Sequence, residues 1–336
     1  FILIKYIDVI DELLEKNKFD LMIIAMPSAS QGQIKSIYES MQDKFQKIKI
    51  LPSMQNILRK EEFSKQLKDI GVEDLLARYP KDLDKNAIQN FIKDKIVLIT
   101  GAGGSIGSEI SRQCKVYGAK QLILVDHSEF NLYSILEELQ DENIIPIMQS
   151  VKDIDILEST FSKYRPQIVI HAAAYKHVPL VEHNILEGIT NNIIGTKNTI
   201  DLSIKYKVEK FVLISTDKAV RPTNVMGTTK RVCELYAQNV DSKNTEIVAV
   251  RFGNVLGSSG SVIPKFKDIT VTHPEITRYF MLIPEACELV LQAASIGKGG
   301  EIFILDMGEP IKIVEYAKKM IGLSGRSEIG IEFCGL

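Results

Sequence analysis

The sequence predicts an α/β protein built on a doubly wound parallel sheet. Buried-strand and helix patterns alternate strictly from Lys95 onward. A glycine-rich turn at residues 101–107 joins the first of these strands to the next helix, and an acidic residue, Asp126, closes the second strand. Repeated strand–helix–strand units place the strands parallel, with helices covering both faces of the sheet.

Six apolar runs account for the strands of this sheet. They span residues 96–99, 121–125, 144–148, 168–171, 211–214 and 247–251. We therefore predict a nucleotide-binding domain over residues 95–256. Beyond about residue 257 the alternation loosens, and we expect residues 257–336 to form mainly a smaller C-terminal substrate-binding region.

The first 57 residues predict a small N-terminal α/β unit that resembles part of a nucleotide fold. Residues 8–16 and 34–45 have helical spacing, whereas 19–26 and 48–51 have the pattern of short strands. This unit contains no glycine-rich phosphate loop. Residues 58–94 are expected to form linker helices, at 59–70 and 84–93.

Composition places the chain among soluble globular proteins. Its 336 residues are 45% hydrophobic and 25% charged, and a net charge of -2 gives no general attraction to nucleic acid. The four cysteines form no CxxC pair, so we predict free thiols in a reducing cytoplasm, without disulfides or a metal site. They are Cys114, Cys233, Cys287 and Cys334.

No apolar run is long enough to span a bilayer. The sequence starts at Phe1, without a Met, and stops at Leu336. We interpret it as part of a longer protein, so this absence says nothing about the full-length chain.

The glycine-rich turn predicts a phosphate-binding loop. Glycines allow a tight turn, close approach of the backbone to a pyrophosphate, and close packing of helix on strand, while the helix N-terminus supplies amide donors. The alternative is a plain tight turn. The predicted cofactor contacts are Gly101, Gly104, Ser105, Ile106 and Gly107.

Two strand-end carboxylates refine the choice of cofactor. Asp126 lies where it can accept both ribose hydroxyls of an adenosine and repel a 2′-phosphate, which favours NAD over NADP. Asp153, after the third strand, is placed to meet the adenine amino group. The alternatives are an exposed loop carboxylate for Asp126 and a solvated turn for Asp153.

Taken together, the motifs resemble the extended short-chain dehydrogenases/reductases that modify nucleotide sugars. The resemblance rests on the glycine loop, Asp126, the segment 171–174 after the fourth strand, Asn192, and the strand end at 215–217. It implies a Rossmann-like domain that binds NAD. It also implies that Ala172 and Ala173 contact the cofactor.

Further segments resemble the UDP-N-acetylglucosamine 4,6-dehydratases, over roughly residues 60–336. They are residues 174–179, 216–219, 251–255 and 277–281. The wider family carries a Tyr four residues before a Lys, and here Met226 precedes Lys230. This points to the large membrane-anchored branch, which includes the PglF type of enzyme that opens bacillosamine synthesis for protein glycosylation. The branch implies a homo-oligomer at the cytoplasmic face of the bacterial inner membrane, attached by segments outside this chain.

The resemblance implies a substrate site for UDP-N-acetylglucosamine. Its residues are Lys176, His177, Asn192, Asn254, Val262 and Arg278. Arg278 suits bidentate phosphate binding. The alternatives are ordinary loop residues for Lys176 and His177, and a surface ion pair for Arg278. His171, which ends a strand, is expected to be structural.

The implied reaction oxidises C4, eliminates water across C5 and C6, and returns hydride to C6. By resemblance Asp217 is the acid at the C6 hydroxyl and Lys218 the base at C5, so we expect Asp217 to be desolvated. Met226 cannot titrate. Lys230 is expected to orient the ribose. We expect Asp217, or a water held by Thr216, to accept the first proton.

Two other functions remain open. One is a nucleotide-sugar epimerase or reductase on the same fold, which needs no acid at C6. The other is a catalytically silent NAD-binding sensor, as the missing Tyr allows. The presence of Thr216, Asp217, Lys218 and Lys230 together favours the enzyme.

Overall fold

The computed structural model describes residues 10–26, 29, 31–41, 44–45, 47–51, 68–69, 83–256, 268–324 and 329–335. The chain divides into two compact units. The larger comprises residues 80–262 and 278–310, and the other comprises 1–79, 263–277 and 311–336. Each is described by itself.

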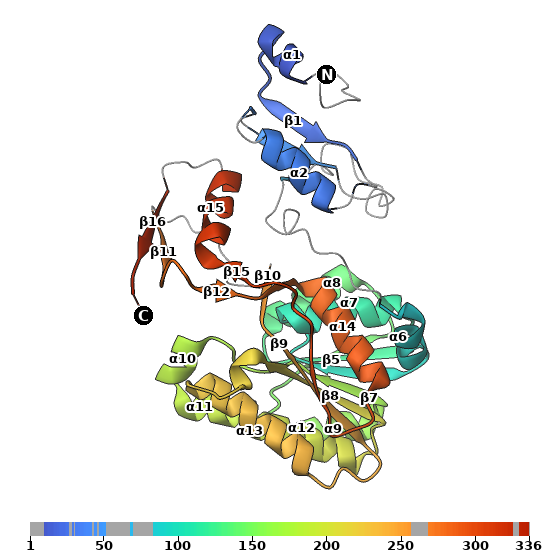
Figure 1. Ribbon diagram of the computed structural model, residues 1–336. Helices are drawn as coiled ribbons and strands as arrows, with labels where there is room; N and C mark the ends of the chain where they lie inside the picture. Colours follow the sequence, from blue (N-terminus) through green and yellow to red (C-terminus); the bar gives the residue numbers. More distant parts are fainter. Residues whose placement is uncertain are drawn as a thin grey trace. The chain divides into compact units, whose positions relative to one another are not determined.

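The larger unit contains a parallel sheet of seven strands, which lies between helices in Figure 1. The strand order is β14-β9-β8-β7-β4-β5-β6. The six strands predicted from the sequence are confirmed, and β14 adds an edge. The order runs outward in both directions from β4 and β7, which makes the gap between their carboxyl ends the switch point where such sheets bind ligands. The strands are β4 (Ile96–Thr100), β5 (Gln121–Asp126), β6 (Ile144–Met148), β7 (Ile168–His171), β8 (Lys210–Thr216), β9 (Glu246–Phe252) and β14 (Ile302–Ile304).

Helices cover both faces of this sheet, as a doubly wound fold requires. Along β4, Val97 and Ile99 pack into one core cluster with α6, α7, α8 and α14, while Leu98 packs into the other with α9, α12 and α13. The helices are α6 (Lys85–Ile92), α7 (Ser105–Val116), α8 (Glu129–Leu139), α9 (Ile154–Tyr164), α10 (Val178–His183), α11 (Ile185–Ile189), α12 (Gly195–Lys205), α13 (Val225–Asn239) and α14 (Ile283–Ile296). A π-helix, η2 (Thr190–Ile194), precedes α12, and a 3₁₀ turn, η3 (Asp217–Ala219), follows β8.

The helix expected at 84–93 is confirmed as α6, which begins after Asp84. The Asp84 carboxylate accepts a hydrogen bond from the Ala87 amide at 2.9 Å and so caps the helix. Ile88 and Ile92, one turn apart, are fully buried. A short parallel pair, β10 (Asn254–Leu256) with β13 (Phe280–Leu282), lies in the same unit.

The N-terminal residues of the other unit form a three-stranded sheet. β1 (Leu21–Ile24) runs parallel to β2 (Lys47–Ile50), and β3 (Lys68–Asp69) runs antiparallel to β2. The helices α1 (Ile10–Lys16) and α2 (Gln31–Met41) confirm both predicted helices, although α2 lies three to four residues earlier than expected. Residues 68–69, expected in a linker helix, form a strand instead because their backbone groups pair with β2; residues 59–67 lie outside the described residues.

The C-terminal residues of that unit add β11 (Asp268–Val271), β15 (Ile311–Lys312), α15 (Ile313–Ser324) and β16 (Gly330–Phe333). β11 and β16 pair in parallel. Within the described ranges, no helix combines the length and the apolar character that crossing a membrane demands.

Candidate functional site

The glycine loop at the end of β4 is fixed by close backbone contacts. Gly101 has φ +66°, and a Cβ there would lie 2.7 Å from the Ala173 amide nitrogen. A Cβ on Gly107 would overlap the carbonyl oxygen of Gly101. Gly104 precedes the first turn of α7, which begins at Ser105. The loop therefore presents the amides at the start of α7 without a covering side chain.

Asp126 ends β5 beside this loop and is 5% exposed. One carboxylate oxygen accepts from the Gly103 amide and the other from the Ser128 amide, both at 2.9 Å. A carboxylate oxygen has a second lone pair, so each can accept a further bond from a ligand hydroxyl. Among the described residues only His127, with Nδ1 at 3.7 Å, is a basic side chain close to Asp126.

His171 lies at the end of β7 in a fully buried network. Its Nδ1 is 2.8 Å from the Thr100 hydroxyl and its Nε2 is 3.0 Å from the Thr196 hydroxyl. Burial, aided by the nearby charge of Lys230, lowers the pKa of His171 to about 3. The imidazole therefore stays neutral and joins β4, β7 and α12, which agrees with a structural role.

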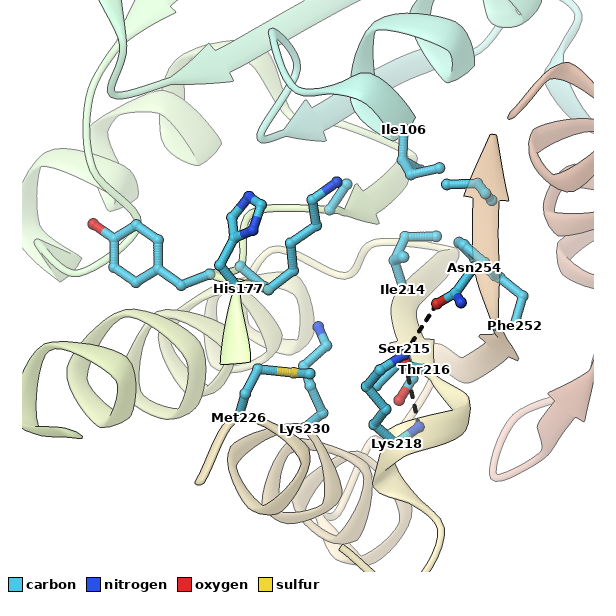
Figure 2. Close-up of a pocket in the computed structure, with 16 residues that line it drawn as sticks. Ile106, His177, Ile214, Ser215, Thr216, Lys218, Met226, Lys230, Phe252 and Asn254 are labelled. Atoms are coloured by element: carbon cyan, nitrogen blue, oxygen red, sulfur yellow. Dashed lines mark hydrogen bonds between the residues drawn. The ribbon is translucent and has the colours of Figure 1, made fainter. Parts of the chain in front are cut away.

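A cavity of about 410 Å³ opens at the carboxyl ends of β7, β8 and β9, within the larger unit. Its volume falls in the range of small-ligand sites. The sequence-predicted residues that line it are Ile106, Ala172, Lys176, His177, Thr216, Lys218, Met226, Lys230 and Asn254 (Figure 2). Sequence reasoning missed Ala174, Tyr175, Ile214, Ser215, Phe252, Gly253 and Val255. All but Ile214 lie inside segments that carried the family resemblance, so membership of those segments at strand ends was the signal that could have found them.

The segment Thr216–Lys218 lies at the end of β8, and hydrogen bonds connect its side chains. The Thr216 hydroxyl donates to Asp217 Oδ1 at 2.9 Å, and the Lys218 Nζ donates to the same oxygen at 3.2 Å. The Lys218 Nζ also donates to the Asn254 amide oxygen at 3.3 Å. Lys218 is thus held between Asp217 and β10, at the edge of the cavity.

The expectation that Asp217 is desolvated is wrong in this structure. Its side chain is 48% exposed, and Asp217 is not among the residues that line the cavity. The carboxylate faces Gly253, where an added Cβ would lie 3.2 Å from Asp217 Oδ2.

Helix α13 carries Met226 and Lys230 on the face turned to the cavity. Asn224 caps it by accepting from the Gly227 amide at 2.8 Å. A Cβ on Gly227 would overlap the Lys218 carbonyl oxygen, so the helix start packs directly on η3. Met226 is 3% and Lys230 6% exposed, and burial lowers the pKa of Lys230.

A buried ionic cluster connects α13 to the strands next to the cavity. Glu234 is fully buried and accepts from the Ser215 hydroxyl at 2.6 Å, from Arg251 Nε at 2.7 Å and from Arg231 Nη1 at 3.1 Å. Burial alone would raise the pKa of Glu234, but the hydrogen bonds from Arg251, Ser215 and Arg231 outweigh it and lower the pKa. The cluster ties β8, β9 and α13 together.

Asn192 does not line the cavity, which corrects its prediction as a direct substrate contact. It is fully buried, its Oδ1 accepts from the Tyr175 amide at 2.8 Å, and its Nδ2 donates to the Tyr175 carbonyl oxygen and to the Thr229 hydroxyl. The side-chain amide is fully engaged within the protein. It holds the loop that carries Lys176 and His177 to the cavity wall.

Two other predicted residues, Asp153 and Arg278, do not line the cavity. Asp153 is exposed and caps α9 by accepting from the Ile156 amide at 3.1 Å. Arg278 is exposed in β12 (Thr277–Arg278) and is not part of the cavity wall. Val262 lies outside the described residues. Within the described part of the chain, no group of three or more His, Cys, Asp or Glu side chains could hold a metal ion.

The fold and this site place the chain in a known family. Residues 97–336 match the family described as polysaccharide biosynthesis protein, and the chain belongs to it. The family consists of extended short-chain dehydrogenases/reductases related to nucleotide-sugar epimerases and dehydratases.

Two curated relatives are similar over almost the whole chain. The capsular polysaccharide biosynthesis protein CapD of Staphylococcus aureus is 47% identical over 347 residues, 98% of this chain and 58% of CapD. EpsC of Bacillus subtilis, a probable polysaccharide biosynthesis protein, is 48% identical over 337 residues, 96% of this chain and 56% of EpsC. The chain therefore spans little more than half the length of either relative.

A solved structure of similar sequence is Pen from Bacillus thuringiensis. It superimposes with a TM-score of 0.69 at 36% identity, covering 73% of this chain and 78% of Pen. A UDP-glucose 4-epimerase of Rickettsia rickettsii is 33% identical over 264 residues, 72% of this chain and 74% of that protein. The dTDP-glucose 4,6-dehydratase DesIV of Streptomyces venezuelae shares the fold, with a TM-score of 0.64.

Proposed function

We propose that this chain catalyses the NAD-dependent 4,6-dehydration of UDP-N-acetylglucosamine to a UDP-4-keto-6-deoxy-N-acetylhexosamine. The observation that carries the proposal is the composition of the cavity wall. Thr216, Lys218, Met226 and Lys230 meet there with Ile106 of the glycine loop. A wall that joins a dinucleotide loop to proton-carrying side chains suits redox chemistry on a bound alcohol.

The residues around the glycine loop fit NAD. The amides at the start of α7 suit a pyrophosphate, and the open lone pairs of Asp126 suit ribose hydroxyls. A 2′-phosphate would meet the buried carboxylate of Asp126, which disfavours NADP. When bound, NAD would accept and return the hydride that moves from C4 to C6.

Three polar side chains line the cavity opposite α13 and are proposed to hold the sugar nucleotide. Lys176 and His177 follow β7, and Asn254 opens β10. The lysine suits the negative diphosphate, whereas the Asn254 amide, already bonded to Lys218, connects substrate binding to the catalytic segment.

Elimination requires an acid at the C6 oxygen and a base at C5. We assign these roles to Asp217 and Lys218, whose side chains share one hydrogen bond at 3.2 Å. The exposed Asp217 carboxylate can take up a proton from water between turnovers. A bound substrate would then cover Asp217 and Lys218 and displace the solvent around them.

The test is to incubate the protein with NAD and UDP-N-acetylglucosamine and follow product mass and cofactor reduction. We expect loss of one water and a 4-keto product. Asp217→Asn and Lys218→Met should lower turnover by roughly 100-fold or more while leaving NAD binding intact. Lys163→Arg, on the exposed face of α9, is the matched control. Normal turnover in both active-site variants would refute the assignment.

Epimerisation at C4 is the second candidate function, because UDP-glucose 4-epimerases are among the relatives. It requires no acid at C6 and leaves the mass of the sugar nucleotide unchanged. The same mass measurement therefore separates the two reactions. A silent NAD sensor would bind both ligands and change neither.

The biological setting is a further proposal. The names of CapD and EpsC favour polysaccharide synthesis, while the bacillosamine route comes from the sequence resemblance alone. Membrane attachment at the cytoplasmic face and homo-oligomerisation rest on that resemblance too. A pull-down of differently tagged full-length copies from membranes tests both.

A further inference from the structure

We propose that the amine of Lys230 accepts the hydroxyl proton when the sugar alcohol is oxidised at C4. This inference rests on the proposed function and deepens it. It replaces the expectation that Asp217, or a water held by Thr216, takes this proton.

The first support is the set of side chains that meet at the cavity. Of the described residues that line it, none is an aspartate or glutamate, whereas three are lysines: Lys176, Lys218 and Lys230. Asp217, the nearest carboxylate in sequence, is 48% exposed and points its Oδ1 at Thr216 and Lys218. A proton released inside the cavity therefore meets amines before it meets a carboxylate.

The second support is the environment of Lys230 itself. It is deeply buried, since only 6% of it is exposed, and it lines the cavity. Its Nζ has no hydrogen-bond or ion-pair partner among the described residues, unlike Lys218, which pairs with Asp217. A buried ammonium without a partner is costly, so the neutral amine is favoured.

The groups that face Lys230 agree with this. On its own helix, Cys233 and Glu234 act to raise its pKa, but burial outweighs them and lowers it. Glu234 is committed to Arg251, Arg231 and Ser215. From β7, His171 contributes a neutral imidazole. Lys176 and Lys218 also line the cavity, and burial lowers the pKa of Lys176 as well, so Lys176 is the alternative acceptor that the test must exclude.

The position of Lys230 relative to Met226 adds a third support. The two lie four residues apart, on one face of α13, and Figure 2 shows the Lys230 amine directed into the cavity beside the Met226 thioether. A thioether leaves that part of the wall without a titratable group. It also adds apolar surface around the amine, which strengthens the desolvation.

The proposed proton transfer balances in atoms and electrons. The O4–H bond breaks and an N–H bond forms on Lys230, which becomes an ammonium. The O–H electron pair becomes the second carbon–oxygen bond, and the hydrogen on C4 leaves with two electrons to the oxidised nicotinamide cofactor. Over the cycle two protons leave the sugar, from O4 and C5, and two return, to the departing water and to C5. Lys230 therefore releases its proton before the next turnover.

The test compares Lys230→Arg with wild type and with the exposed control Lys243→Arg. Arginine keeps a long side chain with hydrogen-bond donors, but it stays protonated and therefore cannot accept the proton. With NAD and UDP-N-acetylglucosamine, we expect Lys230→Arg to lose roughly 100-fold or more in single-turnover cofactor reduction. NAD affinity should stay within a few-fold. Lys230→Ala should recover reduction as methylamine is added, increasingly as pH rises.

A second readout needs no activity. Competitive acylation over a range of pH, with peptide masses as the readout, should give Lys230 a midpoint below that of Lys243. Circular dichroism confirms that each variant is folded.

Each outcome decides between the proposals. If wild type reduces no cofactor and forms no product, the proposed function fails, and the role of Lys230 with it. If wild type reacts and Lys230→Arg reacts equally fast, only the role of Lys230 fails. That role also fails if Lys176→Arg alone loses the oxidation step, or if Lys230 titrates no lower than Lys243. Methylamine rescue together with a low midpoint supports Lys230.

Discussion

The cofactor end and the catalytic end of the site are built by different means. At the cofactor end, backbone segments pack directly on one another, because a Cβ on Gly101 or Gly107 would clash with neighbouring backbone atoms. The buried Asp126 carboxylate accepts hydrogen bonds from two backbone amides. At the catalytic end, side chains bond to side chains at 2.9 to 3.3 Å, and Asp217 is half exposed. The first end is fixed before any ligand arrives, whereas the second has room to change its protonation and contacts.

This difference matches what each end must do. A cofactor that is recycled in every turnover needs a constant position. Acid and base groups must lose and regain protons in every turnover, so their contacts must be able to change. Changes at the cofactor end should therefore alter binding, and changes at the catalytic end should alter rates.

The largest effect is expected from Gly107→Ala at the cofactor end. The new Cβ would overlap the Gly101 carbonyl, so the loop must move, at a cost of about 3 kcal/mol or more. We expect NAD binding, measured by calorimetry, to be lost. Ser108→Ala on the same helix is the control, and an unchanged affinity for Gly107→Ala would show that the loop is not rigid.

Next in size is Arg251→Met, behind the catalytic end. It leaves the fully buried Glu234 with less compensation, and we expect the free energy of unfolding to fall by about 3 kcal/mol. Denaturant titration measures the loss. The double variant Arg251→Met with Glu234→Leu should recover part of it; no recovery would argue against an uncompensated charge as the cause.

A pH effect should follow from His171, between the two ends. Its pKa is about 3 in the folded protein and 6.5 in the unfolded chain, so the unfolded state binds the proton first as pH falls. The stability it contributes is complete above about pH 6.5 and should fall by about 1.4 kcal/mol per pH unit from there toward pH 3. In His171→Gln the free energy of unfolding, measured by denaturant titration, should fall less steeply between pH 6.5 and pH 3. An unchanged dependence on pH would assign it to other groups.

The smallest effect is expected at Asp153. Its Oδ1 caps α9, and its Oδ2 has no protein partner among the described residues, which leaves it for the predicted adenine contact. Asp153→Ala should cost about 1 kcal/mol of stability. Asp153→Ser should keep the cap and weaken NAD binding a few-fold. Unchanged binding in both variants would leave Asp153 as a cap alone.

The sequence predicted the cofactor end better than the catalytic end. The strand patterns and the spacing from Gly101 to Asp126 are local, and the continuous apolar runs of β4 and β5 make them visible. The role of Asn192 was not visible, because its partner Tyr175 is brought to it by the fold. The Asp217 carboxylate faces Gly253, which is far away along the chain, so no local pattern reports the surroundings of Asp217.

Some of the residues that line the cavity could be predicted because they lie close together along the chain. Thr216, Lys218, Met226 and Lys230 form a compact motif, so one strand end and one helix place them together. Arg278 was predicted because a guanidinium suits phosphate binding, and no strand-end position supported it; Arg278 does not line the cavity. Chemistry inferred from residue type alone was therefore a weaker guide than chemistry tied to a strand end.

The most direct test of the proposed dehydration uses UDP-N-acetylglucosamine carrying deuterium at C4. We predict a product lighter by one water, with the deuterium transferred to C6 of the same sugar, because one bound cofactor carries it between the two carbons. Product mass and deuterium NMR locate the label. Retention of the label at C4 with no loss of water would contradict the proposed dehydration; inversion at C4 would then identify an epimerase, and unchanged substrate a silent NAD-binding protein.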